Sequence, residues 1–328
     1  MNEKYGHFIV ETVGAPENLR WIESAKPILH EADVRIRNEA IGVDFIDTLI
    51  RSGKLPTELP TGVGFAGIGI VEQVGGGVKD ITKGQRVAYM YFSPGSYGDE
   101  RVVPASRVVV LPDQGIDPVE AAGALFRGLT AWYLATRLWD IKRGDVVLVH
   151  AAAGGVGLLL TQWLVHIGAI VVGTTTTKKK ADVLKEYGCQ YPVIIPQESF
   201  VEKVKEVSDG QGAAVVFESV GKKTFEESLD CVRRFGLLVS FGWSSGDPSP
   251  ISLMDLRAKG SLFITRPTVT QYTADSDDLK KGVYALFSMI KNGDIKVKVG
   301  NSYRLRDAPI AHADLEAGRT IGSVVLVP

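Results

Sequence analysis

The chain has 328 residues, of which 45% are hydrophobic and 23% charged, and its formal net charge is −1. This composition is typical of a globular protein with a substantial core. It lacks the basic excess that neutralises phosphates, so nucleic acid is not an expected partner. No apolar run approaches the roughly 20 residues that span a bilayer. The first ten residues, MNEKYGHFIV, lack the order of a signal peptide. We therefore expect a cytoplasmic protein with no membrane partner.

The cysteines and histidines do not form a metal-binding pattern. Cys189 and Cys231 are the only cysteines, and the five histidines are scattered, with no His-Glu-x-x-His motif. A disulfide framework and a cysteine-built zinc site are excluded. We expect no metal ion.

The first part of the chain is rich in glycine, proline and β-branched residues. Short alternating runs such as DVRIRNEAIGV (33–43) and GIGIVEQVG (67–75) lie between turn residues. This pattern predicts a mostly antiparallel β domain.

From Pro118 the pattern changes to helices and apolar strands in alternation. A helix is predicted over 118–138, followed by strands and amphipathic helices in turn. Fully apolar short strands that alternate with helices indicate a parallel sheet covered on both faces. The predicted strands are 145–150, 169–174, 191–195, 213–221 and 236–242, and the predicted helices between them include 179–188, 200–208 and 223–235. The last ~60 residues are interpreted as a return to the first domain.

Between the strand that ends at His150 and the next helix lies the sequence AAAGGVG. It matches the dinucleotide template G-x-G-x-x-G as Ala152-x-Gly154-x-x-Gly157, with alanine in the first place. Small residues let an anion approach the N–H groups of a helix N-terminus. The motif predicts a pyrophosphate site, and the alternative is a glycine turn needed only for tight packing.

About 20 residues after this motif, an acidic residue would bind the ribose of NADH. This chain instead has Thr174 to Thr177 followed by Lys178 to Lys180. Hydroxyl and ammonium groups suit a 2′-phosphate, so we predict NADPH in preference to NADH. The alternative is that the lysines are a solvated helix start.

Several longer segments carry a resemblance to a known family. They are AIGVDFIDTLIRSG (40–53), HAAAGGVGLLLTQWLVHIGA (150–169), SLDCVRRFGLLVSFGWSSG (228–246) and GSLFITRP (260–267). With them the chain resembles, end to end, the zinc-free NADPH:quinone oxidoreductases, the ζ-crystallin-like branch of the medium-chain dehydrogenases/reductases. The resemblance implies an α/β protein with a GroES-like, β-rich catalytic domain (1–122 and 268–328) and a Rossmann NADPH-binding domain (123–267). It also implies a homodimer joined through the nucleotide domains.

The resemblance further implies which residues of this chain bind the cofactor. Asp44 would lie beside the nicotinamide, and Arg319 is near the usual C-terminal basic residue. The remaining residues are Gly154, Gly155 and Val156 for the pyrophosphate, Thr176, Thr177 and Lys180 for the 2′-phosphate, and Ser219, Val220, Phe241, Gly242 and Ser244 along the path from adenosine to nicotinamide.

The chain departs from the family pattern at a few positions. Zinc-dependent relatives have cysteine at the place of Asp44 and a Gly-His-Glu motif where this chain has Phe65 and Ala66, so no catalytic zinc is expected. Leu49 replaces a tyrosine often proposed to orient substrate, and Ile195 replaces a tyrosine near the adenosine phosphate. Ala66 also replaces an acid of the quinone reductases.

The implied activity is hydride transfer from NADPH to a quinone. Asp44 could stabilise the oxidised nicotinamide, and Thr130 or water could supply a proton. Asp47 is interpreted as a carboxylate that fixes the fold rather than as a catalytic group. Arg127 is interpreted equally well as a solvated helix residue or as a cation near the cleft. The alternatives in activity are reduction of the double bond of 2-alkenals or enones, and a non-catalytic NADPH-binding protein.

Overall fold

The structure is a computed structural model that describes residues 4–111 and 116–328. It divides into two compact units. Unit 1 comprises Met1–Leu129, Thr273–Lys291 and Val297–Pro328, and unit 2 comprises Thr130–Tyr272 and Asn292–Lys296. The two ends of the chain therefore belong to the same unit. The predicted domain limits, 123–267 for the Rossmann domain, stay a prediction.

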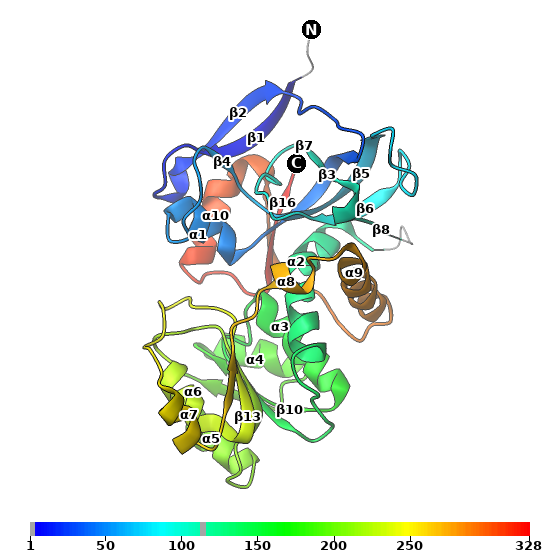
Figure 1. Ribbon diagram of the computed structural model, residues 1–328. Helices are drawn as coiled ribbons and strands as arrows, with labels where there is room; N and C mark the ends of the chain where they lie inside the picture. The colour runs from blue at the N-terminus through cyan, green and yellow to red at the C-terminus, as the bar shows by residue number, and fades with distance from the viewer. Residues whose placement is uncertain (1–3, 112–115) are drawn as a thin grey trace. The chain divides into compact units, whose positions relative to one another are not determined.

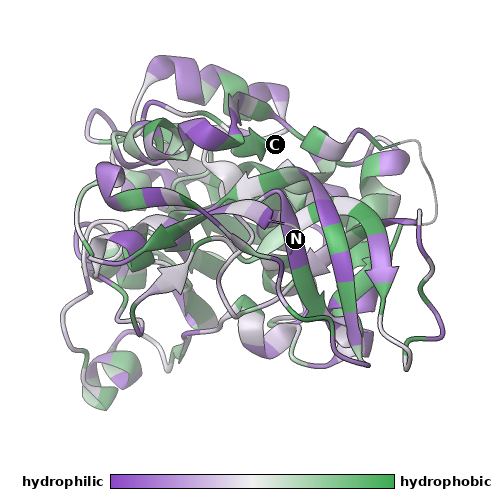
Figure 2. Ribbon diagram, turned by 90° about the horizontal axis from the view of Figure 1, so that it is seen from above, coloured by the Kyte–Doolittle hydropathy of each residue, from purple (hydrophilic) through white to green (hydrophobic). Residues whose placement is uncertain are grey.

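Unit 1 is built mainly from antiparallel strands. In its described residues, one sheet has the order β15-β16-β3-β5-β6-β8 with β7 also paired to β3, and a smaller sheet has the order β2-β1-β4. All these pairs are antiparallel except β15 with β16. Hydrophilic and hydrophobic segments alternate along strands of this unit in Figure 2, which is the pattern of a sheet with one buried face.

The strands of unit 1 are β1 (Lys4–Val10), β2 (Leu19–Ala25), β3 (Asp33–Val43), β4 (Thr61–Gly62), β5 (Ala66–Val74), β6 (Arg86–Met90), β7 (Glu100–Pro104), β8 (Val108–Val110), β15 (Val299–Arg304) and β16 (Ser323–Val327). Its helices are α1 (Phe45–Ser52), α9 (Ser276–Lys291) and α10 (Ala308–Glu316), with the short 3-10 turns η1 (Pro16–Asn18), η2 (Ala105–Arg107) and η3 (Leu305–Asp307). Helix α2 (Pro118–Thr136) continues from unit 1 into unit 2.

Unit 2, which lies wholly within the described residues, is a parallel sheet with helices on both faces. The strand order is β11-β10-β9-β12-β13-β14, and every pair is parallel. Helices α5, α6 and α7 lie on one face and α3 and α4 on the other (Figure 1). Because both faces are covered, the central strands are buried along their whole length, as in β9 and β12.

The strands of unit 2 are β9 (Val146–Val149), β10 (Ile170–Thr175), β11 (Tyr191–Ile194), β12 (Ala213–Glu218), β13 (Val232–Ser240) and β14 (Phe263–Thr265). Its helices are α3 (Gly155–Ile167), α4 (Lys178–Glu186), α5 (Phe200–Val207), α6 (Phe225–Cys231), α7 (Leu253–Ala258) and α8 (Val269–Tyr272).

One predicted helix is shorter than the sequence pattern indicated. The helix predicted over 223–235 ends at Cys231, and strand β13 begins at Val232. Phe235, inside β13, has a φ of 59°, in the left-handed region, which is not the conformation of a right-handed helix. The pairing of β13 with β12 shifts register in this part, between the pairs of Ala213 and Val215.

In the part of the chain that the structure describes, no helix has the length and apolar character needed to cross a membrane.

Candidate functional site

The strand order of unit 2 reverses between β9 and β12. The chain runs outward from β9 to β10 and β11, returns through α5, and continues from β12 to β13 and β14. In open parallel sheets, ligands bind outside the carboxyl ends of the strands at such a reversal. Ser219 follows β12, and its hydroxyl donates to the carbonyl oxygen of His150, which follows β9, over 3.2 Å. The segments after β9 and β12 therefore form the candidate site of unit 2.

The segment after β9 leaves the first turn of α3 open to an anion. The N-cap residue is Gly154, which has no side chain to accept from the helix N–H groups. A Cβ atom on Gly157 would lie 2.5 Å from the carbonyl oxygen of Ala151, so glycine is needed for this close packing. Free N–H groups and the positive end of the helix dipole attract phosphate. These features fit the predicted contact of Gly154, Gly155 and Val156 with a pyrophosphate.

The four threonines at 174–177 divide into two pairs. Thr174 and Thr175 are buried, whereas Thr176 and Thr177 are exposed. The interpretation that all four hydroxyls suit a 2′-phosphate is wrong for the first pair, because β10 extends to Thr175 and buries both side chains. Thr177 is the N-cap of α4, and its Oγ1 accepts from the N–H of Lys180 over 3.3 Å. Exposed hydroxyls at a lysine-rich helix start fit a phosphate group.

The segments after β12 and β13 are hydrogen-bonded to each other. The N–H of Ser244 donates to the carbonyl of Ser219 over 3.3 Å, and the N–H of Ser245 donates to that of Val220 over 2.8 Å. The predicted cofactor-binding residues on these two segments are Ser219, Val220, Phe241, Gly242 and Ser244.

Sequence reasoning missed two buried groups at the ends of β9 and β12. His150 is 1% exposed and Glu218 is fully buried, and His150 Nε2 lies 3.6 Å from Glu218 Oε2. Burial lowers the pKa of His150, although Glu218 acts in the opposite direction. The signal in the sequence is that a titratable residue closes each of two otherwise apolar strands, VVLVH and AAVVFE.

In unit 1, Asp44 precedes α1 and pairs with Arg127 of α2. Arg127 Nε lies 3.2 Å from Asp44 Oδ1, and both side chains are buried. Arg127 also donates to the carbonyl oxygen of Val43. Burial raises the pKa of Asp44, while the charge of Arg127 acts to lower it. The interpretation of Arg127 as a solvated helix residue is therefore wrong.

Asp47 is held in a buried hydrogen-bond network. Its Oδ2 accepts from the N–H of Asp44 over 2.8 Å and from the Tyr97 hydroxyl over 2.9 Å. The Tyr97 hydroxyl also lies 3.1 Å from His312 Nε2. Burial, followed in size by the charge of Asp44, raises the pKa of Asp47 to about 8. Burial, followed in size by the charge of Arg51, lowers the pKa of His312 to about 3. These contacts support the interpretation that Asp47 fixes the fold.

Two further predicted residues lie outside the groups described above. Thr130 is buried in α2. Arg319 donates through Nε to Asp314 Oδ1 over 2.8 Å, and its side chain is 61% exposed. Their roles stay predictions.

The three departures from the family pattern are apolar residues that pack. Leu49 and Ala66 are buried in unit 1. Ile195 is partly buried and packs against the core of the parallel sheet in unit 2. None of these side chains can replace the missing hydroxyl or carboxylate.

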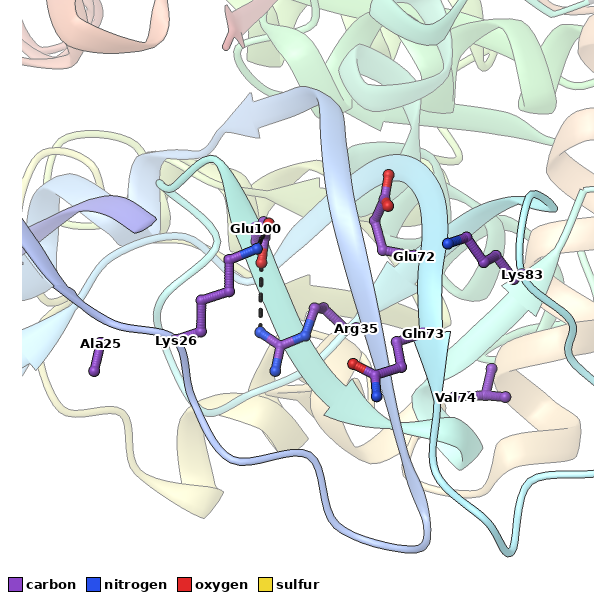
Figure 3. A pocket seen from close by; sticks show the side chains of 8 residues that line it. All are labelled: Ala25, Lys26, Arg35, Glu72, Gln73, Val74, Lys83 and Glu100. Atoms are coloured by element: carbon purple, nitrogen blue, oxygen red, sulfur yellow. Dashed lines mark hydrogen bonds and ion pairs between the residues drawn. The ribbon is translucent and has the colours of Figure 1, made fainter. Parts of the chain in front are cut away.

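A surface cavity of about 740 Å³ lies in unit 1 (Figure 3). Glu100, one of the residues that line it, lies 2.6 Å from Lys26 Nζ and 3.4 Å from Arg35 Nη1. Lys26 and Arg35 are thus paired with Glu100, and the lining contains none of the predicted cofactor-binding residues.

Within the described residues, no group of three histidine, cysteine, aspartate or glutamate side chains lies close enough together to hold a metal ion.

The family is decided by two matching sequence profiles and by full-length relatives. The profile described as alcohol dehydrogenase GroES-like domain matches residues 30–113, and that described as zinc-binding dehydrogenase matches residues 155–286. Quinone oxidoreductase 1 of Escherichia coli (strain K12) is 41% identical over 318 residues, which cover 96% of this chain and 97% of that protein. The chain belongs to the quinone oxidoreductase family of the medium-chain dehydrogenases/reductases. Predicted family and fold class are thereby confirmed.

A second relative and a solved structure have a similar identity to this chain. The 2-haloacrylate reductase of a Burkholderia species is 39% identical over 327 residues, which cover 98% of both chains. The crystal structure of Escherichia coli quinone oxidoreductase complexed with NADPH superposes with a TM-score of 0.95 at 40% identity, and covers 98% of this chain and 100% of that one.

Proposed function

We propose that the protein is an NADPH-dependent quinone oxidoreductase, which transfers hydride from NADPH to a quinone without a metal ion. The observation that carries the proposal is the uncapped N-terminus of α3 at the strand reversal of unit 2. It is supported by the family, since relatives about 40% identical over the full chain are quinone oxidoreductases, one of them solved with NADPH.

In this proposal, the residues of the protein bind and orient the cofactor. Bound NADPH supplies the hydride, so no acid–base pair is required for a readily reduced acceptor. Gly154, Gly155 and Val156 contact the pyrophosphate through the backbone. Thr176, Thr177 and Lys180 surround the 2′-phosphate, and the exposure of the two threonines after β10 supports this role. The residues assigned to the path from adenosine to nicotinamide are Ser219, Val220, Phe241, Gly242 and Ser244.

Asp44 and Thr130 are the two residues to which we assign roles in the transfer of hydride and proton. We assign to Asp44 a position beside the nicotinamide, where its carboxylate favours the cationic, oxidised ring. The pairing with Arg127 keeps this buried carboxylate oriented. Thr130 is assigned as a hydroxyl that can pass a proton to the reduced acceptor. Arg319 is assigned to the cofactor as a peripheral basic residue.

A second candidate activity is reduction of a carbon–carbon double bond conjugated to a carbonyl group. It is favoured by the 2-haloacrylate reductase relative, whose identity of 39% is close to that of the quinone oxidoreductases. Leu49, in place of a tyrosine, adds an apolar side chain where the family pattern has a hydroxyl. The reaction uses the same hydride and the same cofactor site.

The experiment is a panel of acceptors assayed with purified protein and either NADPH or NADH. We expect oxidation of NADPH by a naphthoquinone to exceed that by a 2-alkenal or 2-chloroacrylate in kcat/KM. Faster turnover of the alkenal or the acrylate would select the second activity. Tight NADPH binding without oxidation by any acceptor would indicate a non-catalytic binding protein.

Metal independence follows from the residues at the positions of the zinc ligands. Phe65 and Ala66 can supply no ligand to zinc. We expect metal analysis of active protein to find zinc well below one atom per chain. Stoichiometric zinc, with activity lost on chelation, would contradict this part of the proposal.

We also propose that the protein is a homodimer in the cytoplasm, joined through the edge of the parallel sheet. In the described residues β14 is paired only to β13 and is the last strand of the sheet. Phe263 on this strand is 54% exposed. An exposed apolar edge strand is a site where a second strand can pair.

A further inference from the structure

A buried chain of hydrogen bonds begins at the segment that precedes α3. Ala151 has a φ of 49°, in the left-handed region that is unfavourable for a residue with a Cβ atom. Its N–H donates to Thr174 Oγ1 over 3.2 Å. Thr174 Oγ1 also lies 3.0 Å from His150 Nδ1. A hydroxyl has one hydrogen and two lone pairs, so Thr174 Oγ1 can accept from the N–H of Ala151 and still donate to His150 Nδ1 where that nitrogen is unprotonated.

The chain of hydrogen bonds continues from His150 Nε2 to Glu218. Ser228 Oγ lies 2.9 Å from His150 Nε2, 2.7 Å from Glu218 Oε2 and 2.7 Å from the carbonyl oxygen of Thr224. The carboxylate and the carbonyl can only accept, so they take the single hydrogen of the Ser228 hydroxyl, and its oxygen accepts from His150 Nε2–H. Burial lowers the pKa of His150 and so favours the neutral ring. With its proton on Nε2, the neutral ring leaves Nδ1 to accept from the Thr174 hydroxyl.

Glu218 extends the chain of hydrogen bonds to the segment after β12. Its Oε1 accepts from the N–H of Val220 over 2.6 Å and from that of Gly221 over 3.0 Å. Its Oε2 accepts from the Thr224 hydroxyl over 2.8 Å. A fully buried carboxylate therefore fixes the backbone of Val220 and Gly221, directly after Ser219.

We propose that Thr174, His150, Ser228 and Glu218 are positioning residues that hold the two cofactor-binding segments of unit 2 in register with each other. This inference rests on the proposed binding of NADPH to those segments. The four side chains act through the backbone of Ala151 and Val220. A buried network that is fully satisfied specifies one geometry, and loss of one member leaves its neighbours unsatisfied.

The test compares two substitutions of the same kind at two buried threonines of unit 2. Thr174→Val removes a hydroxyl that belongs to the chain of hydrogen bonds. Thr161→Val removes a hydroxyl in α3 that has no hydrogen-bond partner among the described residues. We expect the Kd for NADPH, measured by calorimetry, to rise about tenfold for Thr174→Val and to stay within about twofold for Thr161→Val.

Two further measurements separate positioning from general stability. Thr174→Ser restores the hydroxyl, so we expect it to recover an NADPH Kd within about twofold of wild type. Nitrogen-15 NMR of the imidazoles in wild-type protein should show His150 protonated on Nε2 and unprotonated on Nδ1. This measurement does not depend on the folding of any variant.

The proposal is overturned if Thr174→Val and Thr161→Val bind NADPH equally well. It is also overturned if His150 is charged at neutral pH or carries its proton on Nδ1. Wild-type protein that fails to bind NADPH would overturn the proposed function instead, and the tautomer of His150 in the same sample would still decide whether this hydrogen-bond chain exists.

Discussion

Arg127 Nε lies 3.2 Å from Asp44 Oδ1, and the two side chains are only 6% and 9% exposed. The pair joins α2 to the residue that precedes α1 within unit 1. A buried carboxylate with its partner removed is an uncompensated charge, so each partner depends on the other.

Arg127→Met should destabilise the protein strongly. It leaves Asp44 without its cation, and we expect the free energy of unfolding, measured by urea denaturation, to fall by about 3–5 kcal/mol. The double variant with Asp44→Asn should recover much of this loss because no charge is then left buried. Equal stability of the single and double variants would contradict the importance of the pair.

Asp47 should make the stability depend on pH. Its pKa is about 8 in the folded protein and its ordinary value is 3.8, so the folded state binds the extra proton between these values. The free energy of unfolding should therefore fall as pH rises towards 8. His312, with a pKa lowered from 6.5 to about 3, acts in the opposite direction only below 6.5.

The measurement is therefore urea denaturation between about pH 6.5 and 8. In this range Asp47 changes the free energy of unfolding and His312 does not. We expect Asp47→Asn, which cannot ionise, to flatten the decline seen in wild type. An equally steep decline in the variant would show that another group titrates.

Lys180→Glu should weaken the preference for NADPH. A carboxylate beside the 2′-phosphate repels it, and we expect the ratio of kcat/KM for NADPH to that for NADH to fall at least about tenfold. Lys185→Glu, on an exposed position of the same helix, is the matched control and should leave the ratio unchanged. If both variants keep the wild-type ratio, the lysines are a solvated helix start.

Gly157→Ala should disrupt the segment before α3. The added Cβ would meet the carbonyl oxygen of Ala151 at 2.5 Å, so the backbone must move. We expect a loss of roughly 1–3 kcal/mol in the free energy of unfolding and weaker NADPH binding by calorimetry. Gly76→Ala, whose Cβ would meet nothing within 4 Å, should leave both unchanged. Wild-type affinity in Gly157→Ala would show that the close packing is not needed for the cofactor.

Phe263→Arg should dissociate the proposed dimer. A charge on the edge strand β14 opposes pairing with a second sheet, so sedimentation velocity should show a shift towards monomer. Tyr284→Arg is the control, because Tyr284 is also an exposed aromatic residue, 46% exposed, but belongs to unit 1. A monomeric wild type, or a Phe263→Arg variant that stays dimeric, would exclude this interface.

Local sequence pattern was sufficient for most of the fold. The apolar strands that end at Val149 and Glu218 and the glycines before α3 follow from neighbouring residues alone, because strand and helix periodicities and turn chemistry are local. The pattern failed at Val232, where helical spacing continued into strand β13. There the parallel pairing with β12, a contact between distant segments, decides the structure.

In the candidate site, too, some features follow from local sequence and others from contacts between distant segments. The loop of Gly154 to Gly157, the run of threonines before the lysines and the lack of zinc-ligand residue types at Phe65 and Ala66 were determined by the sequence itself, since each depends on residue type at a fixed spacing. The burial of Thr174 and the linkage of His150 to Glu218, and of Asp44 to Arg127, were decided only by the tertiary structure. These partners are separated by many residues in the chain, and only the folding of the sheet and helices brings their polar atoms close together.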